Sequence, residues 1–546
     1  MSESGSNSEI PSSENTNSGG RTSIGWFSKC KWDKCSVIAF AIMVVVSIVG
    51  VYSKTFLYGT PISKLDLITQ LDILYNPSLK GVTVSVSQDP SACTQSIPKE
   101  SFIQASLRKL QSPIWNPNSG CGQPIIADPS NTLWDPVDLF FSADDQPSYN
   151  RGLLLKIVLG GLAAYFYFFR AGAAPWAAAT AAIGYALTAR ILYQTELPTN
   201  IMTGIFLVFS FLDKDSSLKR ILLCALALSF CYVGIHPELF FVGTCSAVAV
   251  WFFSEGKKHV GILRAIGTMA LTGIATIALV GPFLFSFLEY MRYAHTYKYA
   301  ASALEFIPLS QLAYFFYSAK IPNTYFPGLV LLLGLPVGIF AAARLYYGAF
   351  LVIAVCLLFA CRPGQLETIF AQAPFSYLLP DYVLRPVHLL ACMICALGLT
   401  QLSKIEAGKL KSQIGLLVAS TLLAIFPILL IRAGIAPDAF QIGFTPKLFL
   451  SSSIIVVISA LCLLMLNRGK LGRIAAFAIP LLNLALVIPP AKTELPYSAS
   501  VPLPPADKVA LIKTLQSYPG ARFSACGDRL IQPNTGLFFG LADLRT

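Results

Sequence analysis

The feature that most constrains this chain is a series of apolar stretches, each roughly the length of a bilayer-spanning helix, although several are short or interrupted by proline. A helix rises about 1.5 Å per residue and a hydrocarbon core is about 30 Å thick, so roughly 20 apolar residues suffice. We count about thirteen such stretches. They are 36–57, 151–169, 173–193, 199–212, 219–235, 237–254, 264–288, 326–343, 346–361, 383–402, 414–432, 446–466 and 472–491.

Composition agrees with a membrane protein. Hydrophobic residues make up 55% of the 546 residues and charged residues only 12%, whereas soluble proteins carry about 25% charged residues. We therefore expect an all-α polytopic membrane protein with about 11–13 transmembrane helices.

Three regions follow from this pattern. Residues 1–30 are dominated by Ser, Asn and Gly and are expected to form a disordered cytoplasmic tail. Residues 36–491 form the transmembrane domain, which includes a polar first extracytoplasmic loop at 58–150. Residues 492–546 turn polar and rich in proline, and we expect an extracytoplasmic segment that begins a larger, truncated external domain.

The short loops between the spans determine the orientation. If the amino terminus is inside and successive spans cross the membrane in alternating directions, nearly every basic cluster lies in the cytoplasm, as the positive-inside rule requires. The carboxyl terminus is then outside. The net charge of +12 is explained by these loops, and without a basic surface interleaved with aromatic residues we expect no nucleic-acid partner. The clusters are Lys29/Lys31/Lys34, Arg170, Lys214/Lys219/Arg220, Lys257/Lys258/Arg264, Arg344, Lys404/Lys409/Lys411 and Arg468/Lys470/Arg473.

Most of the 13 cysteines lie within apolar spans, where cysteine behaves as a small hydrophobic residue. Cys93 and Cys121 instead lie in the first loop. They could form a disulfide if that loop faces an oxidising compartment, and their connectivity stays open.

The first loop carries the acidic residues best placed for chemistry. Asp66 follows the first span closely, where a carboxylate could serve as a general base or a metal ligand toward a substrate at the membrane interface. A helix cap or a solvated loop charge is the equally simple alternative. Asp128 is a weaker candidate of the same kind.

A short polar turn, His236-Pro237-Glu238, separates two apolar spans. An ionisable residue costs about 2.5–3.5 kcal/mol at the bilayer centre and less near an interface. The two side chains could line a polar cavity, bind a divalent cation or transfer a proton. The alternative is an external hairpin turn whose polar groups are hydrated.

Cationic residues near the external ends of spans could bind an anionic head group. Arg385 opens a late span, and Arg292 and Lys298 lie in a stretch rich in tyrosine. Guanidinium groups suit phosphate because they offer planar, paired donors. Snorkelling to lipid head groups and an interfacial aromatic belt are the alternatives. The sequence has no phosphate-loop, GxSxG or HExxH motif, so the corresponding enzyme classes are unsupported.

Several short motifs occur in order along the chain. They are Asp66-Leu67-x-x-Gln70, Trp115-Asn116-Pro117, Gly122-Gln123-Pro124-x-x-Ala127-Asp128, His236-Pro237-Glu238, Leu384-Arg385-Pro386, Gln532-Pro533-Asn534-Thr535 and Phe539-Gly540-Leu541-x-Asp543. Together they resemble the YfhO family of bacterial membrane proteins, which belongs to the GT-C class of membrane glycosyltransferases. The resemblance extends along nearly the whole chain after residue 36. This chain differs in ending where the external domain would continue and in a segment at 81–111 that looks like an insertion.

The resemblance implies a GT-C-like helical bundle in the bacterial cytoplasmic (inner) membrane. It implies an enzyme that moves a sugar from a polyprenyl-phosphate-linked donor to an extracytoplasmic glycan or lipid acceptor, with inversion, beside membrane lipid. Asp66 would be the catalytic residue, and Gln70, Trp115, Asn116, Asp128, Arg292, Lys298 and Arg385 would bind substrate. An optional divalent cation, Mg²⁺ or Mn²⁺, would be held by Asp66, Asp128, His236 and Glu238.

Two other functions fit the same composition. A transporter or flippase for a lipid-linked or anionic solute would also use buried polar residues near broken helices, but it should show related halves, and no internal repeat is evident. A non-catalytic scaffold that presents an external domain would tolerate replacement of the first-loop acids.

Overall fold

The computed structural model describes the helical bundle and part of the first loop. The described residues are 34–59, 97–118, 122–128, 135–141, 145–188, 199–212, 216–253, 262–293, 328–343, 347–361, 378, 380–404, 415, 418–419, 421–422, 446–466, 468–494, 513–514, 516–518, 522–523 and 542–543.

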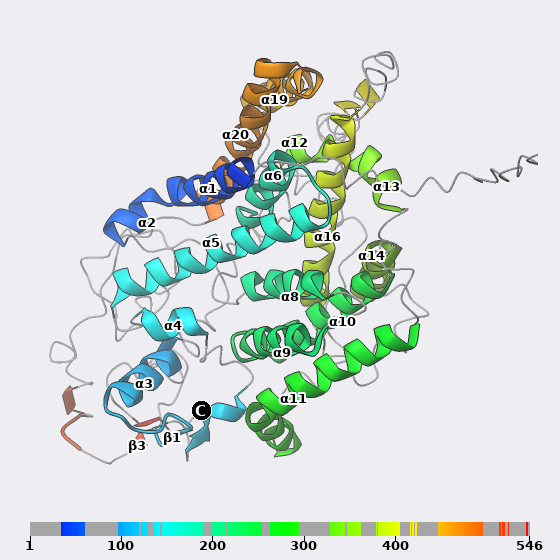
Figure 1. Cartoon of the computed structure of the whole chain (residues 1–546). Helices are drawn as coiled ribbons and strands as arrows, with labels where there is room; N and C mark the ends of the chain where they lie inside the picture. Colours follow the sequence, from blue (N-terminus) through cyan, green and yellow to red (C-terminus); the bar gives the residue numbers. More distant parts are fainter. Residues whose placement is uncertain are drawn as a thin grey trace, which may run out of the picture.

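Helices make up almost all of the described secondary structure, which confirms the all-α class (Figure 1). The strands are very short: β1 (Trp115–Asn116) pairs antiparallel with β2 (Gln123–Pro124), and β3 (Arg522–Phe523) pairs parallel with β4 (Ala542–Asp543). The helices are α1 (Lys34–Val51), α2 (Ser53–Tyr58), α3 (Ile97–Arg108), α4 (Pro136–Phe140), α5 (Gln146–Arg170), α6 (Pro175–Ala186), α8 (Thr199–Phe211), α9 (Leu218–Val233), α10 (Pro237–Phe253), α11 (Ile262–Tyr293), α12 (Leu329–Leu332), α13 (Leu335–Ala343), α14 (Tyr347–Cys361), α16 (Pro380–Leu402), α19 (Pro446–Met465) and α20 (Gly469–Glu494), with the 3-10 turn η4 (Ile125–Ala127).

Five helices in the described part of the chain are long and apolar enough to cross a membrane. Several shorter apolar helices accompany them, as in a multi-pass membrane protein. The five segments are Lys34–Val51, Pro147–Arg170, Ile262–Tyr290, Tyr382–Leu402 and Gly469–Val487.

Most apolar stretches coincide with helices, and two of them are divided. The stretch at 36–57 contains α1 and α2, which are separated at Tyr52. The stretch at 326–343 contains α12 and α13, separated at Leu333 and Gly334. Gly334 packs directly on α16, since a Cβ there would lie 2.1 Å from the Cys395 carbonyl oxygen. A side chain at that position would therefore separate the two helices. The stretch at 414–432 lies mostly outside the described residues.

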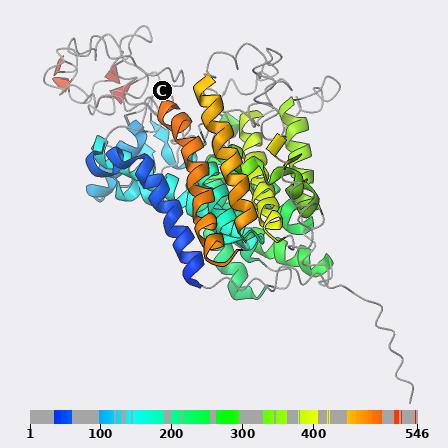
Figure 2. The ribbon, with the colours of Figure 1, turned by 90° about the horizontal axis from the view of Figure 1, so that it is seen from above.

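Helix α16 lies at the centre of the bundle. It packs against α13, α14, α6 and α10, and 94% of its most apolar segment is buried inside the protein. Helix α5 packs against α1, α6 and α8. Helices α19 and α20 run side by side along one flank (Figure 2).

A compact group of short elements covers one end of α5. We call this group the lobe and define it as residues 97–141, with α3, β1, β2, η4 and α4. In Figure 1 it lies beneath α5 and beside α9 and α11. Helix α4 contacts α5, and η4 contacts α11. The lobe belongs to the loop predicted to be extracytoplasmic, so its contacts show where that loop meets the bundle.

Candidate functional site

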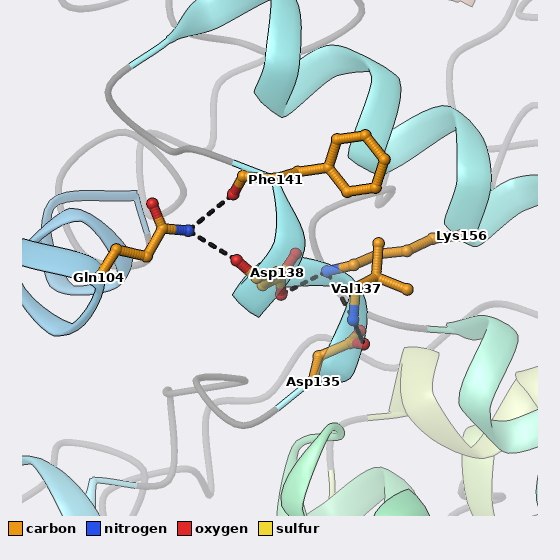
Figure 3. Close-up of polar contacts among 6 residues, drawn as sticks. All are labelled: Gln104, Asp135, Val137, Asp138, Phe141 and Lys156. Carbon is orange, nitrogen blue, oxygen red and sulfur yellow. Dashed lines mark hydrogen bonds and ion pairs between the residues drawn. The ribbon is translucent and has the colours of Figure 1, made fainter. Parts of the chain in front are cut away.

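A buried lysine joins the lobe to the bundle. Lys156 projects from α5, and its Nζ lies 2.5 Å from Asp138 Oδ2 and 3.2 Å from Asp135 Oδ2. All three side chains are buried. Figure 3 shows both carboxylates approaching the ammonium group from α4 and the residue before it. Because a buried charge is tolerated only when it is paired, this cluster fixes α4 against α5.

Local sequence explains how α4 presents these acids. Asp135 caps the helix, since its Oδ1 accepts a hydrogen bond from the Val137 backbone N–H at 2.9 Å, and Pro136 occupies the first helical position. Gln104 of α3 fixes the other end. Its Nε2 donates to the carbonyl oxygens of Asp138 at 2.6 Å and Phe141 at 2.7 Å (Figure 3). The lobe is therefore held together by side chains that satisfy the ends of a very short helix.

Burial and the neighbouring charges together affect the protonation of Asp138. Burial is the largest influence on Asp138 and raises its pKa to about 6, while Lys156 opposes the shift and Asp135 adds to it. Glu100 of α3 is also buried and acts electrostatically on Lys156. Burial therefore favours the neutral, protonated form of Asp138, while the ammonium group of Lys156 favours the charged form.

A second ion pair lies within the lobe and involves a predicted site residue. Lys99 of α3 donates to Asp128 Oδ2, and Gln123 Nε2 donates to the same oxygen at 3.0 Å. Lys99 and Asp128 are both buried. In this structure Asp128 ties the end of η4 to α3. Its predicted substrate and metal roles stay predictions.

Trp115 and Asn116 lie in β1 and shape the turn that leads to Asp128. The indole of Trp115 packs over Gly122, where a Cβ would lie 2.3 Å from Trp115 Cζ2 and the backbone φ is +104°. Only glycine fits this position. Asn116 is buried, and its Oδ1 accepts from the Asn118 backbone N–H at 3.0 Å. Trp115 is half exposed, and its role in binding substrate stays a prediction.

The His236 turn lies against the buried cluster. Gly234 faces Asp135, since a Cβ on Gly234 would lie 3.6 Å from the Asp135 Cα. Pro237 begins α10, the Phe240 backbone N–H donates to the His236 carbonyl oxygen at 3.0 Å, and Glu238 occupies the first turn. His236 is buried and Glu238 is half-buried. The turn is therefore tucked against the lobe and is not a hydrated hairpin.

Arg385 of α16 lies near the His236 turn, with Tyr382 close to both. The ring of His236 is 5.8 Å from the ring of Tyr382 in α16, and the Arg385 guanidinium carbon is 5.1 Å from the same tyrosine ring. Arg385 is only 2% exposed. One turn further along α16, His388 stacks on Tyr185 of α6 with ring centroids 5.0 Å apart. Aromatic and cationic side chains thus extend from the lobe into the bundle.

A small cavity of about 30 Å³ lies where the lobe, the His236 turn and α11 meet. Asp128, Ile235 and Pro237 line it together with Phe283 and Phe287 of α11. The structure therefore brings two separately predicted segments, the one ending at Asp128 and the His236 turn, to one place.

The remaining predicted residues are placed only in part. Arg292 is exposed in the last turn of α11. Asp66, Gln70 and Lys298 lie outside the described residues, as do Cys93 and Cys121. Among the residues the structure describes, no three His, Cys, Asp or Glu side chains are grouped to hold a metal ion. A divalent cation that also uses Asp66 stays a prediction.

Sequence reasoning did not identify Lys156, Asp135, Asp138 or Tyr382. A signal for Lys156 was present: it is a lone lysine inside an apolar run, Gly152 to Leu159, where charge is costly and demands a partner. Asp135 also had one, since Asp followed by Pro is a helix start signal. Tyr382 had none, because its place between His236 and Arg385 depends on tertiary packing.

The contacts agree with the alternation of the predicted spans. Asp128, Asp135, His236 and Tyr382, all predicted to lie on one side, come together around the lobe. Arg170 and Arg220, both predicted to lie on the other side, line a separate pocket. Which side faces the cytoplasm stays a prediction.

No protein-family model matches the chain, and no curated protein sequence matches it. Two solved structures are similar. The crystal structure of ArnT from Cupriavidus metallidurans bound to undecaprenyl phosphate has 12% sequence identity and a TM-score of 0.47, covering 93% of this chain and 85% of that one. The apo state of the same protein has 13% identity and a TM-score of 0.40, with coverages of 82% and 80%.

Proposed function

We propose that the chain is a GT-C-type membrane glycosyltransferase that takes a sugar from a polyprenyl-phosphate-linked donor. The acceptor is an extracytoplasmic cell-envelope polymer or lipid. The observation that carries the proposal is that Gly234, two residues before His236, lies against Asp135 of the lobe, while Tyr382 lies near both His236 and Arg385. It places a cation and several acids at one end of an apolar bundle, where the head group of a lipid-linked substrate would meet its acceptor.

Arg385 suits the leaving group. Cleavage of the bond between sugar and phosphate builds negative charge on the phosphate oxygens, and a preorganised cation nearby stabilises that charge most where water is excluded. Arg385 is buried and stands over the Tyr382 ring. Guanidinium also pairs with phosphate through two parallel donors. The prenyl tail would lie along the apolar helices.

The base is proposed from the sequence resemblance. Asp66 accepts the proton of the acceptor hydroxyl, and the hydroxyl oxygen attacks the anomeric carbon. The carbon–oxygen bond to the phosphate breaks, polyprenyl phosphate leaves with the bonding pair, and the anomeric configuration inverts. The cluster of Lys156 with Asp135 and Asp138 holds the lobe in place during this step.

The test compares Asp66→Asn with Asp89→Asn, a change of the same kind in the same loop. Both are assayed in purified protein for transfer from a small panel of polyprenyl-phosphate sugars. General-base catalysis contributes about 10²–10⁴-fold, so Asp66→Asn should lose at least about 100-fold. The Asp89 variant should keep its activity. Full transfer by Asp66→Asn would disprove the base assignment.

A flippase is the competing function, and an assay of the protein in liposomes separates it from a transferase. A flippase moves the donor across the bilayer without breaking the sugar–phosphate bond. Release of polyprenyl phosphate therefore supports the transferase. Transbilayer movement without release supports the flippase.

A further inference from the structure

A second pocket lies at the far end of α5 from the lobe. It measures about 500 Å³ and is lined by residues of α5, α8 and α9. Its walls are mostly apolar, and two arginines, Arg170 and Arg220, also line it. Arg170 ends α5, 14 residues beyond Lys156, so it lies about 21 Å along the helix from the buried cluster. The pocket is therefore distinct from the candidate active site.

Arg170 is held in a fixed orientation. Its Nε donates to Ser210 Oγ at 3.0 Å, and its Nη2 donates to the Ser210 carbonyl oxygen at 2.7 Å. Its guanidinium carbon also lies 4.0 Å from the centroid of the Phe211 ring. A side chain that merely snorkels to the interface needs no such partners. The ordered guanidinium indicates a binding group whose entropy of immobilisation has already been lost.

The second arginine extends the positive charge across the pocket. Arg220 lies in the first turn of α9 and acts electrostatically on Cys224, which also lines the pocket. The residues that line the pocket include these two arginines and no carboxylate, so the described lining carries net positive charge.

We propose that this pocket binds an anionic phospholipid of the surrounding bilayer. The phosphate would lie between Arg170 and Arg220. One acyl chain would run over Leu207, Val208 and Leu223, which form the apolar wall. Basic pockets between transmembrane helices are suited to anionic head groups, and each cation near the surface contributes measurably to such binding. The positive-inside alternation predicts the cytoplasmic leaflet as the source.

The test measures lipid binding to the purified full-length protein by native mass spectrometry. Dioleoyl phosphatidylglycerol is compared with dioleoyl phosphatidylcholine, and glycerol 3-phosphate serves as the free-phosphate probe. Wild type should prefer the anionic lipid and should not retain glycerol 3-phosphate. Arg170→Gln/Arg220→Gln should weaken phosphatidylglycerol binding by roughly 5-fold for each arginine removed.

The matched control is Arg468→Gln/Arg473→Gln, which removes two exposed arginines from the same predicted side but outside this pocket. It should leave phosphatidylglycerol binding unchanged. Leu223→Trp keeps both arginines and places a larger side chain in the pocket, so it should also reduce phosphatidylglycerol binding. This variant provides a second test if the arginine variant misfolds. Equal loss in the control, no preference for the anionic lipid, or retention of glycerol 3-phosphate would each overturn the proposal.

Discussion

Replacing Lys156 with methionine tests whether the buried cluster anchors the lobe. The change keeps the apolar length of the side chain and removes the only cation shown to pair with Asp135 and Asp138 in the described structure. Removing one partner of a buried ion pair costs about 3–5 kcal/mol. Each 1.4 kcal/mol is ten-fold, so the population of the open lobe should rise roughly 100-fold or more.

Hydrogen–deuterium exchange of purified protein measures that opening. In Lys156→Met, backbone amides of α3 and α4 should exchange at least about 100-fold faster, while amides at the centre of α16 should not change. Lys109→Met is the control, because Lys109 is exposed in the same lobe. Adding Asp138→Asn to Lys156→Met should recover part of the protection, since it removes one of the two carboxylates left without a cation. Wild-type exchange in Lys156→Met would refute the anchoring role.

Three further predictions follow from the same contacts. Burial holds the pKa of Asp138 at about 6, above its ordinary value of 3.8, so the folded state keeps a proton that the unfolded chain has lost. The stability that this proton provides is full below pH 3.8 and is lost as the pH rises through about 6. Hydrogen exchange of the lobe, compared from about pH 3.5 to 7, should show this dependence in wild type and not in Asp138→Asn. Gln104→Leu leaves the carbonyl oxygens of Asp138 and Phe141 without their donor, which costs about 1–3 kcal/mol, and exchange in α4 should rise about 5- to 100-fold without global unfolding. Arg385→Gln should lower release of polyprenyl phosphate by about 100-fold or more while the fold stays intact. Arg108→Gln, which changes an exposed residue of the lobe, should leave release unchanged. Equal activity in the two variants would contradict the role of Arg385.

The helices were largely predictable because apolar length determines them. The stretch expected at 237–254 is α10 at Pro237–Phe253, and that at 446–466 is α19 at Pro446–Met465. Proline begins both helices, where its missing N–H has no cost. The break between α12 and α13 was not predicted from 326–343, because the close approach of Gly334 to α16 is a tertiary contact.

Features of the site were predictable only where the residues concerned lie in one short segment of the chain. The sequence left two alternatives for the His236 turn, a polar cavity or a hydrated external hairpin, and the structure places Gly234 of this turn against Asp135. The partner of Asp128 is Lys99, 29 residues away, and that of Asp138 is Lys156, 18 residues away. No periodicity links such residues, so their pairing follows from the fold and not from local sequence.

The most direct test of the account measures bond cleavage and lipid movement on one sample. Wild-type protein in liposomes is supplied with a polyprenyl-phosphate sugar and an acceptor fraction, and both released polyprenyl phosphate and transbilayer movement of the intact donor are followed. The account predicts release that depends on acceptor and is lost in Asp66→Asn and Arg385→Gln. Movement of the intact donor without any release would contradict it.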